Sequence, residues 1–216
     1  YQGHSAVLQL RSCNIRASYF HERVRVAGNE YLASEDGQRK NRPLPNYWNR
    51  AKRDVSQTYR KICAYTCQRV AGLGEIDHFL PKSKYKSLAY EWSNYRLSSS
   101  EANRIKGDKE DIVDPFEIRH GWFQLGFPDC FVKPGPRVPS EQRRRVERTI
   151  RVLRLNDRDR YVDERMNIVS CFIKGRIDLD MLAYFYPFVA YEIKRQGEDY
   201  VRRKVVSKRR MSNGQT

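Results

Sequence analysis

The chain has 216 residues, enough for one domain with appendages or for two small domains. Its net charge of +16 points to nucleic acid, an acidic membrane surface or an acidic protein as the partner. Because 39% of the residues are apolar and 12% are aromatic, the chain can bury a core, which excludes a disordered basic tail.

The cysteine content and the apolar runs bear on the compartment. Five cysteines are an odd number, thinly spread, which favours a reducing interior over a secreted disulfide scaffold. The most apolar run, Met181 to Tyr191, is too short to span a bilayer and lies between Asp180 and Glu192. We therefore expect a soluble, cytoplasmic protein without a membrane partner.

The first sixty residues have a mixed pattern with a polar break at "SEDGQRKNRPLPN", which predicts a loop. We expect an α+β protein in which a small ββα motif is embedded in mainly helical structure. The expected division is an N-terminal accessory segment over 1–60, a core over 61–115, and a helical domain with a basic tail over 116–216.

The core begins with "GEIDHFLPKS", which predicts a short strand from Gly74 that ends near Pro81. The stretch "SNYRLSS" predicts a second strand, and "SSEANRIKGD" predicts a helix. Ser98 or Ser99 is the expected cap, with a capping box from Ser98 to Glu101, and Gly107 is placed to end the helix. The expected order is strand, loop, strand, helix.

Beyond the linker "KPGPRVPS" the chain is predicted to be helical. A helix capped by Ser140 places Val146, Ile150 and Leu153 on one face. A second helix is expected after Asn156. A third, from about Asp178, contains Pro187 and should be kinked there, and the basic C-terminus is expected to be a fraying helix.

The core also contains the residues needed to cleave a phosphodiester. His78 is a candidate general base, since a neutral histidine can take a proton from water near neutral pH, and activity should then rise through about pH 6 to 7. Asp77 offers an anionic oxygen and Asn103 an amide oxygen to a hard divalent ion. Asn94 is placed to bond the loop that carries His78, and Lys106 lies one turn after Asn103, where it can hold a phosphate.

Each of these residues also has an ordinary structural interpretation. Histidine is commonly structural, asparagine commonly bonds locally, and loop lysines commonly face solvent. Adjacent residues of a strand point to opposite faces, so Asp77 and His78 converge on one ion only if the strand ends there.

The spacing of "DHFLPKS", the two asparagines and "NRIKGD" resembles that of HNH endonucleases, the ββα-metal nuclease family, over about Lys61 to Asp114. The resemblance implies that Asp77 and Asn103 bind Mg²⁺ or Mn²⁺, that His78 is the general base, and that Lys106 contacts phosphate. Asn94 would orient the loop. Asn103 stands where many members have histidine and others, including the HNH domain of the CRISPR effector nuclease, have asparagine.

A looser resemblance extends further along the chain. "VDPF", "GWFQLGF" and "TIRVLRLNDRDRYVDERMNIV" look like the helical extension of HNH proteins in bacterial phage-defence systems, such as the nuclease subunit of Septu and its retron-linked relatives. Those nucleases work beside an ATPase, so the resemblance implies an ATPase or other regulatory subunit as a partner.

The sequence departs from the family at the zinc knuckle that many members carry. Cys63 and Cys67 form one C-x-x-x-C pair, but Ser99 and Ala102 stand where the second pair is expected. Two thiolates do not complete a tetrahedral site, so we predict no structural zinc.

Basic residues surround the motif and predict contacts to nucleic acid. These are Lys82, Lys84, Lys86, Arg96, Arg104 and Lys106. A second basic stripe is formed by Arg144, Arg148 and Arg151. It predicts either contacts to a nucleic-acid backbone or simply the solvent-exposed face of an amphipathic helix.

Three functions remain open at this point. The first is a metal-dependent HNH endonuclease, acting on DNA more than RNA, that serves as the effector of a phage-defence system. The second is a nucleic-acid-binding or assembly subunit on a degenerate HNH scaffold. The third is a basic adaptor for an acidic protein. The retention of the five motif residues together favours the first.

Overall fold

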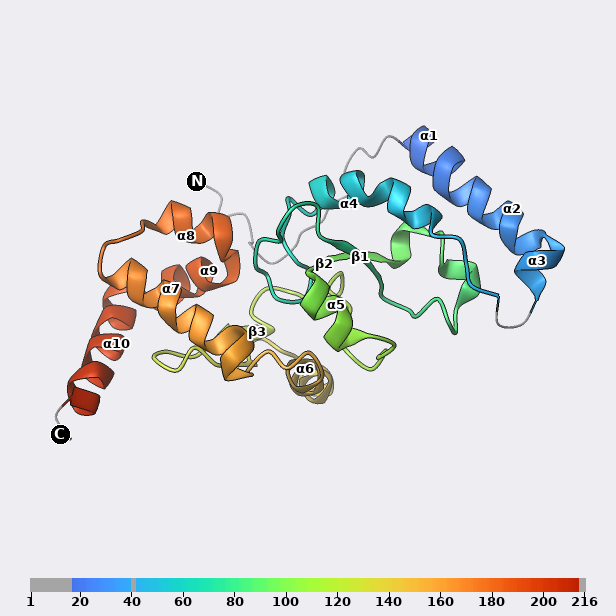
Figure 1. Ribbon diagram of the computed structural model, residues 1–216. Helices are drawn as coiled ribbons and strands as arrows, with labels where there is room; N and C mark the ends of the chain where they lie inside the picture. Colours follow the sequence, from blue (N-terminus) through green and yellow to red (C-terminus); the bar gives the residue numbers. More distant parts are fainter. Residues whose placement is uncertain (1–16, 40–41, 214–216) are drawn as a thin grey trace.

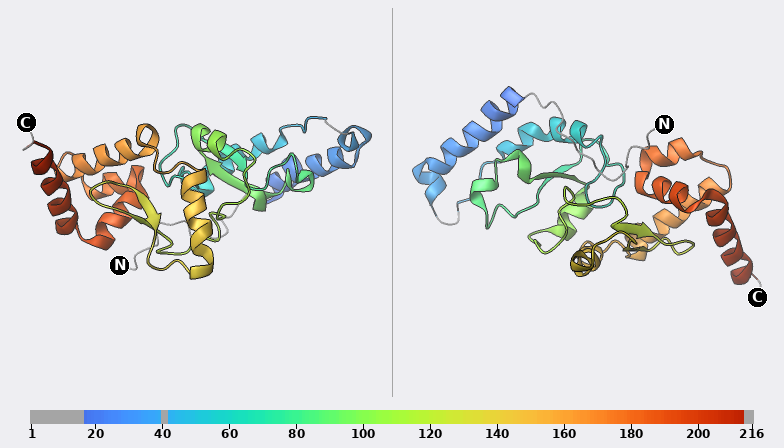
Figure 2. Two further views of the ribbon diagram at one scale, coloured as in Figure 1. Left: turned by 90° about the horizontal axis from the view of Figure 1, so that it is seen from below. Right: turned by 180° about the vertical axis from the view of Figure 1, so that it is seen from behind.

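The computed structural model describes residues 17–39 and 42–213. The protein is mainly helical, and its described part contains two small two-stranded antiparallel sheets, which confirms the α+β class. Figure 1 shows an elongated molecule, with the first helices at one end, the last helices at the other and the strands between them. The two views in Figure 2 show the same elongation.

The N-terminal helices form a layer beside the first sheet. Its elements are α1 (Ala17–Phe20), the π-helical η1 (His21–Val26), α2 (Ala27–Ala33), α3 (Glu35–Gln38), the 3-10 turn η2 (Tyr47–Ala51) and α4 (Lys52–Thr58). The stretch predicted as a loop thus contains the short helix α3. Ser34 caps it by accepting a hydrogen bond from the backbone of Gly37 at 3.2 Å.

The core of the motif has the expected order of strand, loop, strand and helix. Strands β1 (Glu75–His78) and β2 (Tyr95–Ser98) are antiparallel, and α5 (Ser100–Lys106) follows directly. The loop between the strands holds two 3-10 turns, η3 (Lys86–Leu88) and η4 (Trp92–Asn94).

The cap of α5 is Ser99, whose hydroxyl accepts from the backbone of Ala102 at 3.2 Å. The predicted capping box from Ser98 is wrong, because Ser98 belongs to β2 and its hydroxyl bonds the carbonyl of Ser99. Gly107 ends the helix with a φ of +48°, a conformation that favours glycine.

The register of the hairpin decides where the site residues point. Asp77 lies opposite Arg96, and His78 lies opposite Tyr95, so Asp77 and His78 face opposite sides of the sheet. Helices α4 and α5 both contact the two strands, and they flank the hairpin in Figure 1. Each face of this small sheet is therefore covered by helical structure.

The C-terminal half contains a hairpin that the sequence did not predict, β3 (Phe123–Leu125) and β4 (Val132–Pro134). The helices that follow are α6 (Ser140–Val152), the π-helical η5 (Arg158–Val162), α7 (Asp163–Ile173), α8 (Leu179–Phe185), α9 (Pro187–Gln196) and α10 (Glu198–Asn213).

The kinked third helix of the prediction is in fact two helices. Tyr186 has a φ of −133°, and Pro187 begins α9, where its missing N–H costs nothing. Asp178 caps α8 through the backbone of Met181 at 2.7 Å.

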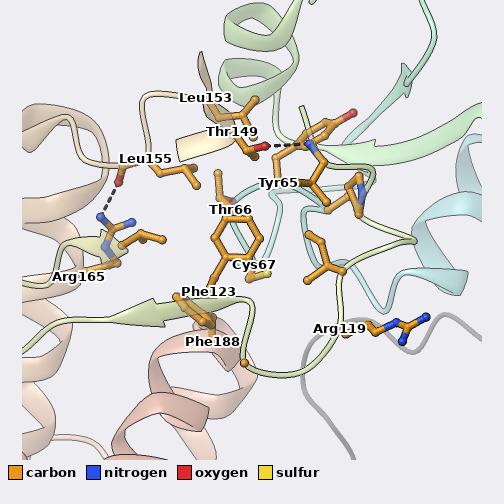
Figure 3. Close-up of a pocket in the computed structure, with 16 residues that line it drawn as sticks. Tyr65, Thr66, Cys67, Arg119, Phe123, Thr149, Leu153, Leu155, Arg165 and Phe188 are labelled. Atoms are coloured by element: carbon orange, nitrogen blue, oxygen red, sulfur yellow. Dashed lines mark hydrogen bonds between the residues drawn. The ribbon is translucent and has the colours of Figure 1, made fainter. Parts of the chain in front are cut away.

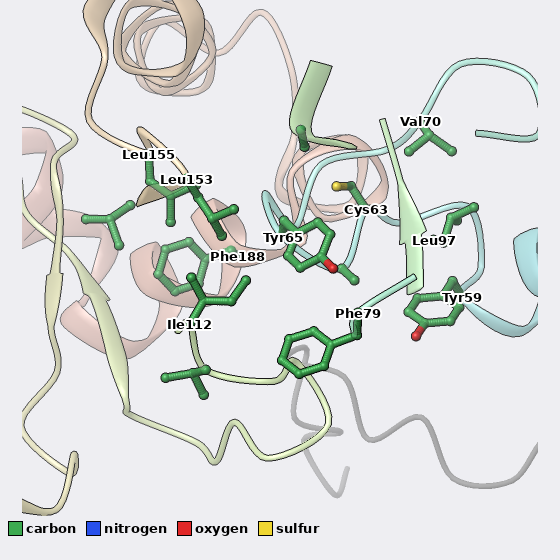
Figure 4. Packing of buried hydrophobic residues seen from close by; sticks show 14 of the residues in the cluster. Tyr59, Cys63, Tyr65, Val70, Phe79, Leu97, Ile112, Leu153, Leu155 and Phe188 are labelled. Carbon is green, nitrogen blue, oxygen red and sulfur yellow. The ribbon is translucent and has the colours of Figure 1, made fainter. Parts of the chain in front are cut away.

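The buried apolar side chains form one cluster that runs from Phe20 to Val201. Figure 4 shows its central part, where Tyr65 lies among residues of the first hairpin and the C-terminal helices. The site described below is thus supported by both halves of the chain. Within the described residues, no helix combines the length and apolar character needed to cross a bilayer.

Candidate active site

Asn94 closes the loop that leads away from His78. Its side chain accepts from the backbone N–H of Leu80 at 2.8 Å and donates to the Leu80 carbonyl at 2.9 Å. It also donates to the carbonyl of Leu88 at 3.3 Å. Asn94 therefore makes the same pair of hydrogen bonds to the Leu80 backbone that a neighbouring strand would make. A contact between Asn94 and the loop that carries His78 was expected from the sequence.

The His78 ring is fixed by a single backbone carbonyl. Its Nε2 lies 2.8 Å from the oxygen of Ala89, and because a carbonyl can only accept, Nε2 carries the hydrogen. The lone pair of the neutral ring is then on Nδ1. Trp48 and Tyr95 lie edge-on to the ring, with centroid distances of 5.0 and 5.3 Å.

Burial gives His78 an unusual acidity. The side chain is 6% exposed, and desolvation lowers its pKa from 6.5 to about 4. The ring is thus neutral at pH 7 and can accept a proton at Nδ1. This is the protonation state required of a general base.

Asp77 lies on the other face of β1 and is paired with Lys106. The Lys106 side chain is fully buried, and its Nζ lies 3.0 and 3.2 Å from the two carboxylate oxygens. The same ammonium donates to the backbone oxygen of His78 at 2.6 Å. Tyr65 donates its hydroxyl to the Asp77 carboxylate as well.

The environment acts on this pair in two opposing ways. Burial raises the pKa of the Asp77 carboxyl and lowers the pKa of the Lys106 ammonium, because both charged forms lose water. The mutual attraction of the two groups opposes both shifts. The phenol of Tyr65, whose pKa is raised by burial and by Asp77, remains a hydrogen-bond donor.

Asn103 does not join Asp77 in this arrangement. Its side-chain nitrogen donates to Glu75 at 2.8 Å. That bond, together with one from Ser100, lowers the pKa of the Glu75 carboxyl. The sequence reasoning missed Glu75, although a residue two positions before Asp77 lies on the same face of the strand.

The predicted contacts to nucleic acid divide into buried and exposed residues. Arg96 is buried and forms a bidentate pair with Asp114 at 2.9 and 2.5 Å, and its guanidinium stacks on Phe116 at 3.7 Å. Arg96 and Lys106 are therefore internal. Lys82, Lys84 and Arg104 are exposed, Lys86 is half-buried, and Lys84 is paired with Glu110 at 2.7 Å.

The arrangement does not fit a divalent ion as it stands. Both oxygens of Asp77 are bonded by Lys106 and one by Tyr65, while Asn103 is turned to Glu75. Among the described side chains, no three His, Cys, Asp or Glu residues gather as a ligand set. The predicted metal ligands are thus close to their expected elements but engaged with other partners.

An apolar cavity of about 60 Å³ lies outside this site (Figure 3). Tyr65, Phe123, Leu153 and Phe188 are among its walls, and none of the five motif residues lines it. Tyr65 separates it from Asp77. The cavity is therefore not where the candidate chemistry takes place.

Comparison with protein-family models and with curated proteins found no match for this chain. The resemblance to HNH endonucleases therefore rests on the motif residues of the sequence.

Proposed function

We propose that the protein is a metal-dependent HNH endonuclease that hydrolyses phosphodiester bonds of nucleic acid, with DNA the more expected substrate. We further propose that it is the effector of a bacterial phage-defence system beside an ATPase or other regulatory subunit. The observation that carries the proposal is the neutral His78 ring, held through Nε2 by Ala89 so that Nδ1 can accept a proton.

In this proposal Nδ1 of His78 takes a proton from water as the water oxygen bonds to phosphorus. The bond from phosphorus to the 3′ oxygen breaks, and that oxygen takes up a proton from solvent and leaves as the 3′-hydroxyl. The positive charge that develops on the ring is stabilised by the Ala89 carbonyl, which accepts from Nε2–H. Asn94 holds the loop that places Ala89 and His78 together. Mg²⁺ or Mn²⁺, when bound, would stabilise the negative charge on the phosphate, with Asp77 and Asn103 as the proposed ligands. Because Asp77 is paired with Lys106 and Asn103 is bonded to Glu75 in this structure, no catalytic step is assigned to the ion.

The test is cleavage of supercoiled plasmid and of total tRNA in Mg²⁺, in Mn²⁺ or in EDTA. We expect metal-dependent cleavage of plasmid by the wild type and its loss in His78→Ala. His21→Ala is a matched control, because His21 is exposed on η1, and it should cleave as the wild type does. Full activity of His78→Ala would remove His78 from the mechanism.

A second candidate is supported by the buried pair of Asp77 and Lys106, which closes the motif. On this view the protein binds nucleic acid or assembles with partners on an inactive HNH scaffold. Salt-dependent binding of plasmid or tRNA, with no cleavage in any metal, would favour the scaffold over the nuclease.

A further inference from the structure

The Lys106 ammonium is surrounded by oxygen atoms. Nζ contacts both carboxylate oxygens of Asp77, the backbone oxygen of His78 at 2.6 Å and the backbone oxygen of Gly107 at 3.3 Å. A carboxylate with two carbonyls is a typical ligand set for a hard metal cation. Here the positive charge at its centre belongs to a lysine side chain that is fully buried.

The geometry points to a site built for a cation, and we propose that the Lys106 ammonium is its resident cation and keeps divalent ions from Asp77 until it leaves. The inference deepens the proposed function, because it concerns the same carboxylate. Its test measures metal binding, so it can fail while the nuclease proposal holds, and the reverse is also true.

The charges of the surrounding cluster explain why the ammonium excludes a divalent ion. Asp77 and Asp114 carry two negative charges, and Lys106 and Arg96 carry two positive ones, so the cluster is neutral. A divalent ion added beside Lys106 would leave two uncompensated positive charges in a desolvated place. A divalent ion that replaces Lys106 leaves only one, and Glu75 lies on the same face of β1 to balance it.

Lys106 is the last residue of α5, and its ammonium enters the oxygen cluster on a flexible four-carbon stem. To leave, this buried side chain must rotate and exchange its oxygen contacts for others. A phosphate of a bound strand offers the ammonium another anion. Arrival of substrate would therefore free Asp77 at the place where the phosphate lies.

The experiment uses Mn²⁺ as the probe, with binding followed by electron paramagnetic resonance and by thermal unfolding without nucleic acid. Lys106→Ala should bind Mn²⁺ about tenfold or more tightly than the wild type, since a positive charge next to the ion is gone. Its melting temperature should be low in EDTA and rise with Mn²⁺, because an ion that binds the folded state stabilises it. The wild type should show neither change.

Two further variants make the outcome decisive. Asp77→Asn/Lys106→Ala removes the carboxylate, so the Mn²⁺ response of Lys106→Ala should vanish. Lys106→Ser leaves a smaller void and should respond as Lys106→Ala does if the alanine variant is poorly folded. The proposal is overturned if the wild type binds Mn²⁺ as tightly as the variants, or if neither single variant folds or gains stability in Mn²⁺.

Discussion

His78 and Asp77 are neighbours in the chain, but they lie on opposite faces of β1 and in different surroundings. His78 is packed among aromatic rings and bonded to the Ala89 carbonyl, and its burial keeps the ring neutral. Asp77 is neutralised by a buried lysine. The strand thus places a lysine-paired carboxylate and a neutral imidazole at adjacent positions on its opposite faces.

The lowered pKa of His78 makes stability depend on pH. In the unfolded chain the ring takes up a proton near its ordinary pKa of 6.5, whereas the folded ring does so only near 4. Stability from this group is therefore fully present above pH 6.5 and is lost as pH falls towards 4, by up to about 3 kcal/mol. Urea unfolding of the wild type and of His78→Gln at several pH values isolates the effect. Parallel pH curves for the two proteins would refute it.

The same pKa changes the expectation for catalysis. The sequence predicted a rise in activity through about pH 6 to 7, from the ordinary pKa of histidine. Because burial lowers the pKa of His78 to about 4, the acid limb of the rate profile should lie near that value instead. This shift was invisible in the sequence, since it depends on Trp48 and Tyr95 closing around the ring.

Two of the basic residues predicted to contact phosphate are buried in this structure. Arg96 and Lys106 were assigned to phosphate because they lie beside the motif. Their burial depends on Asp114 and Asp77 receiving them in the folded chain, and spacing alone does not reveal such partners. The strand that carries His78, the contact of Asn94 with the following loop and the helix that carries Asn103 could be predicted, because each depends on local order along the chain.

At the scale of elements, the loop between β1 and β2 depends on Asn94. Asn94→Ala would leave the half-buried N–H and carbonyl of Leu80 without these partners, at a cost of about 2 kcal/mol. Asn94→Asp keeps the acceptor for the Leu80 N–H but sets a buried carboxylate against the carbonyls of Leu80 and Leu88, so it should cost at least as much as Asn94→Ala. Chemical unfolding of the three proteins measures this order, and equal stability of wild type and Asn94→Ala would contradict it.

Two glycines just before β1, Gly72 and Gly74, have similar positive φ values but different surroundings. Gly72 and Gly74 have φ values of +56° and +68°, and a Cβ on Gly72 meets nothing within 4 Å. A Cβ on Gly74 would lie 2.9 Å from Leu97 and from Val70. Gly72→Ala should cost about 1 kcal/mol of backbone strain, and Gly74→Ala about 1 to 3 kcal/mol more, because the packing must shift. Equal losses in thermal or urea unfolding would show that the hairpin entry tolerates the added atom.

Elements with strong local signals were predicted, and those without were not. The first hairpin, α5 and α6 carry alternation, a capping serine or an apolar stripe. Strands β3 and β4 have three residues each, too few for a periodic pattern, and each pairs only with the other in a two-stranded sheet. Pro187 was correctly seen as disruptive, but whether a proline kinks a helix or begins the next one is decided by the residue before it.

At the scale of the whole molecule, the basic residues behind the net charge of +16 have two different roles. Some basic residues hold the interior together, as Arg96 does. Others are exposed near the motif, as Lys82 and Arg104 are, although Arg104 lies 4.0 Å from Glu101. The exposed set is the part of the charge that is accessible to a polyanion.

Salt dependence separates these two roles. Lys82→Gln and Arg104→Gln should each lower the slope of log affinity against log salt by about 0.9 for duplex DNA. Lys174→Gln, at an exposed position after α7, is the control and should leave the slope unchanged. Fluorescence anisotropy over a salt series measures all three, and equal slopes would move the binding surface away from the motif.

The central claim is that His78 activates water, and chemical rescue tests it most directly. The measurement is the rate of plasmid cleavage by wild type and by His78→Gly, with and without added imidazole. We expect His78→Gly to lose about a hundredfold or more of the rate and to regain part of it as imidazole is added, because the free base can enter the space left by the ring. Cleavage by His78→Gly at the wild-type rate without imidazole would contradict the account.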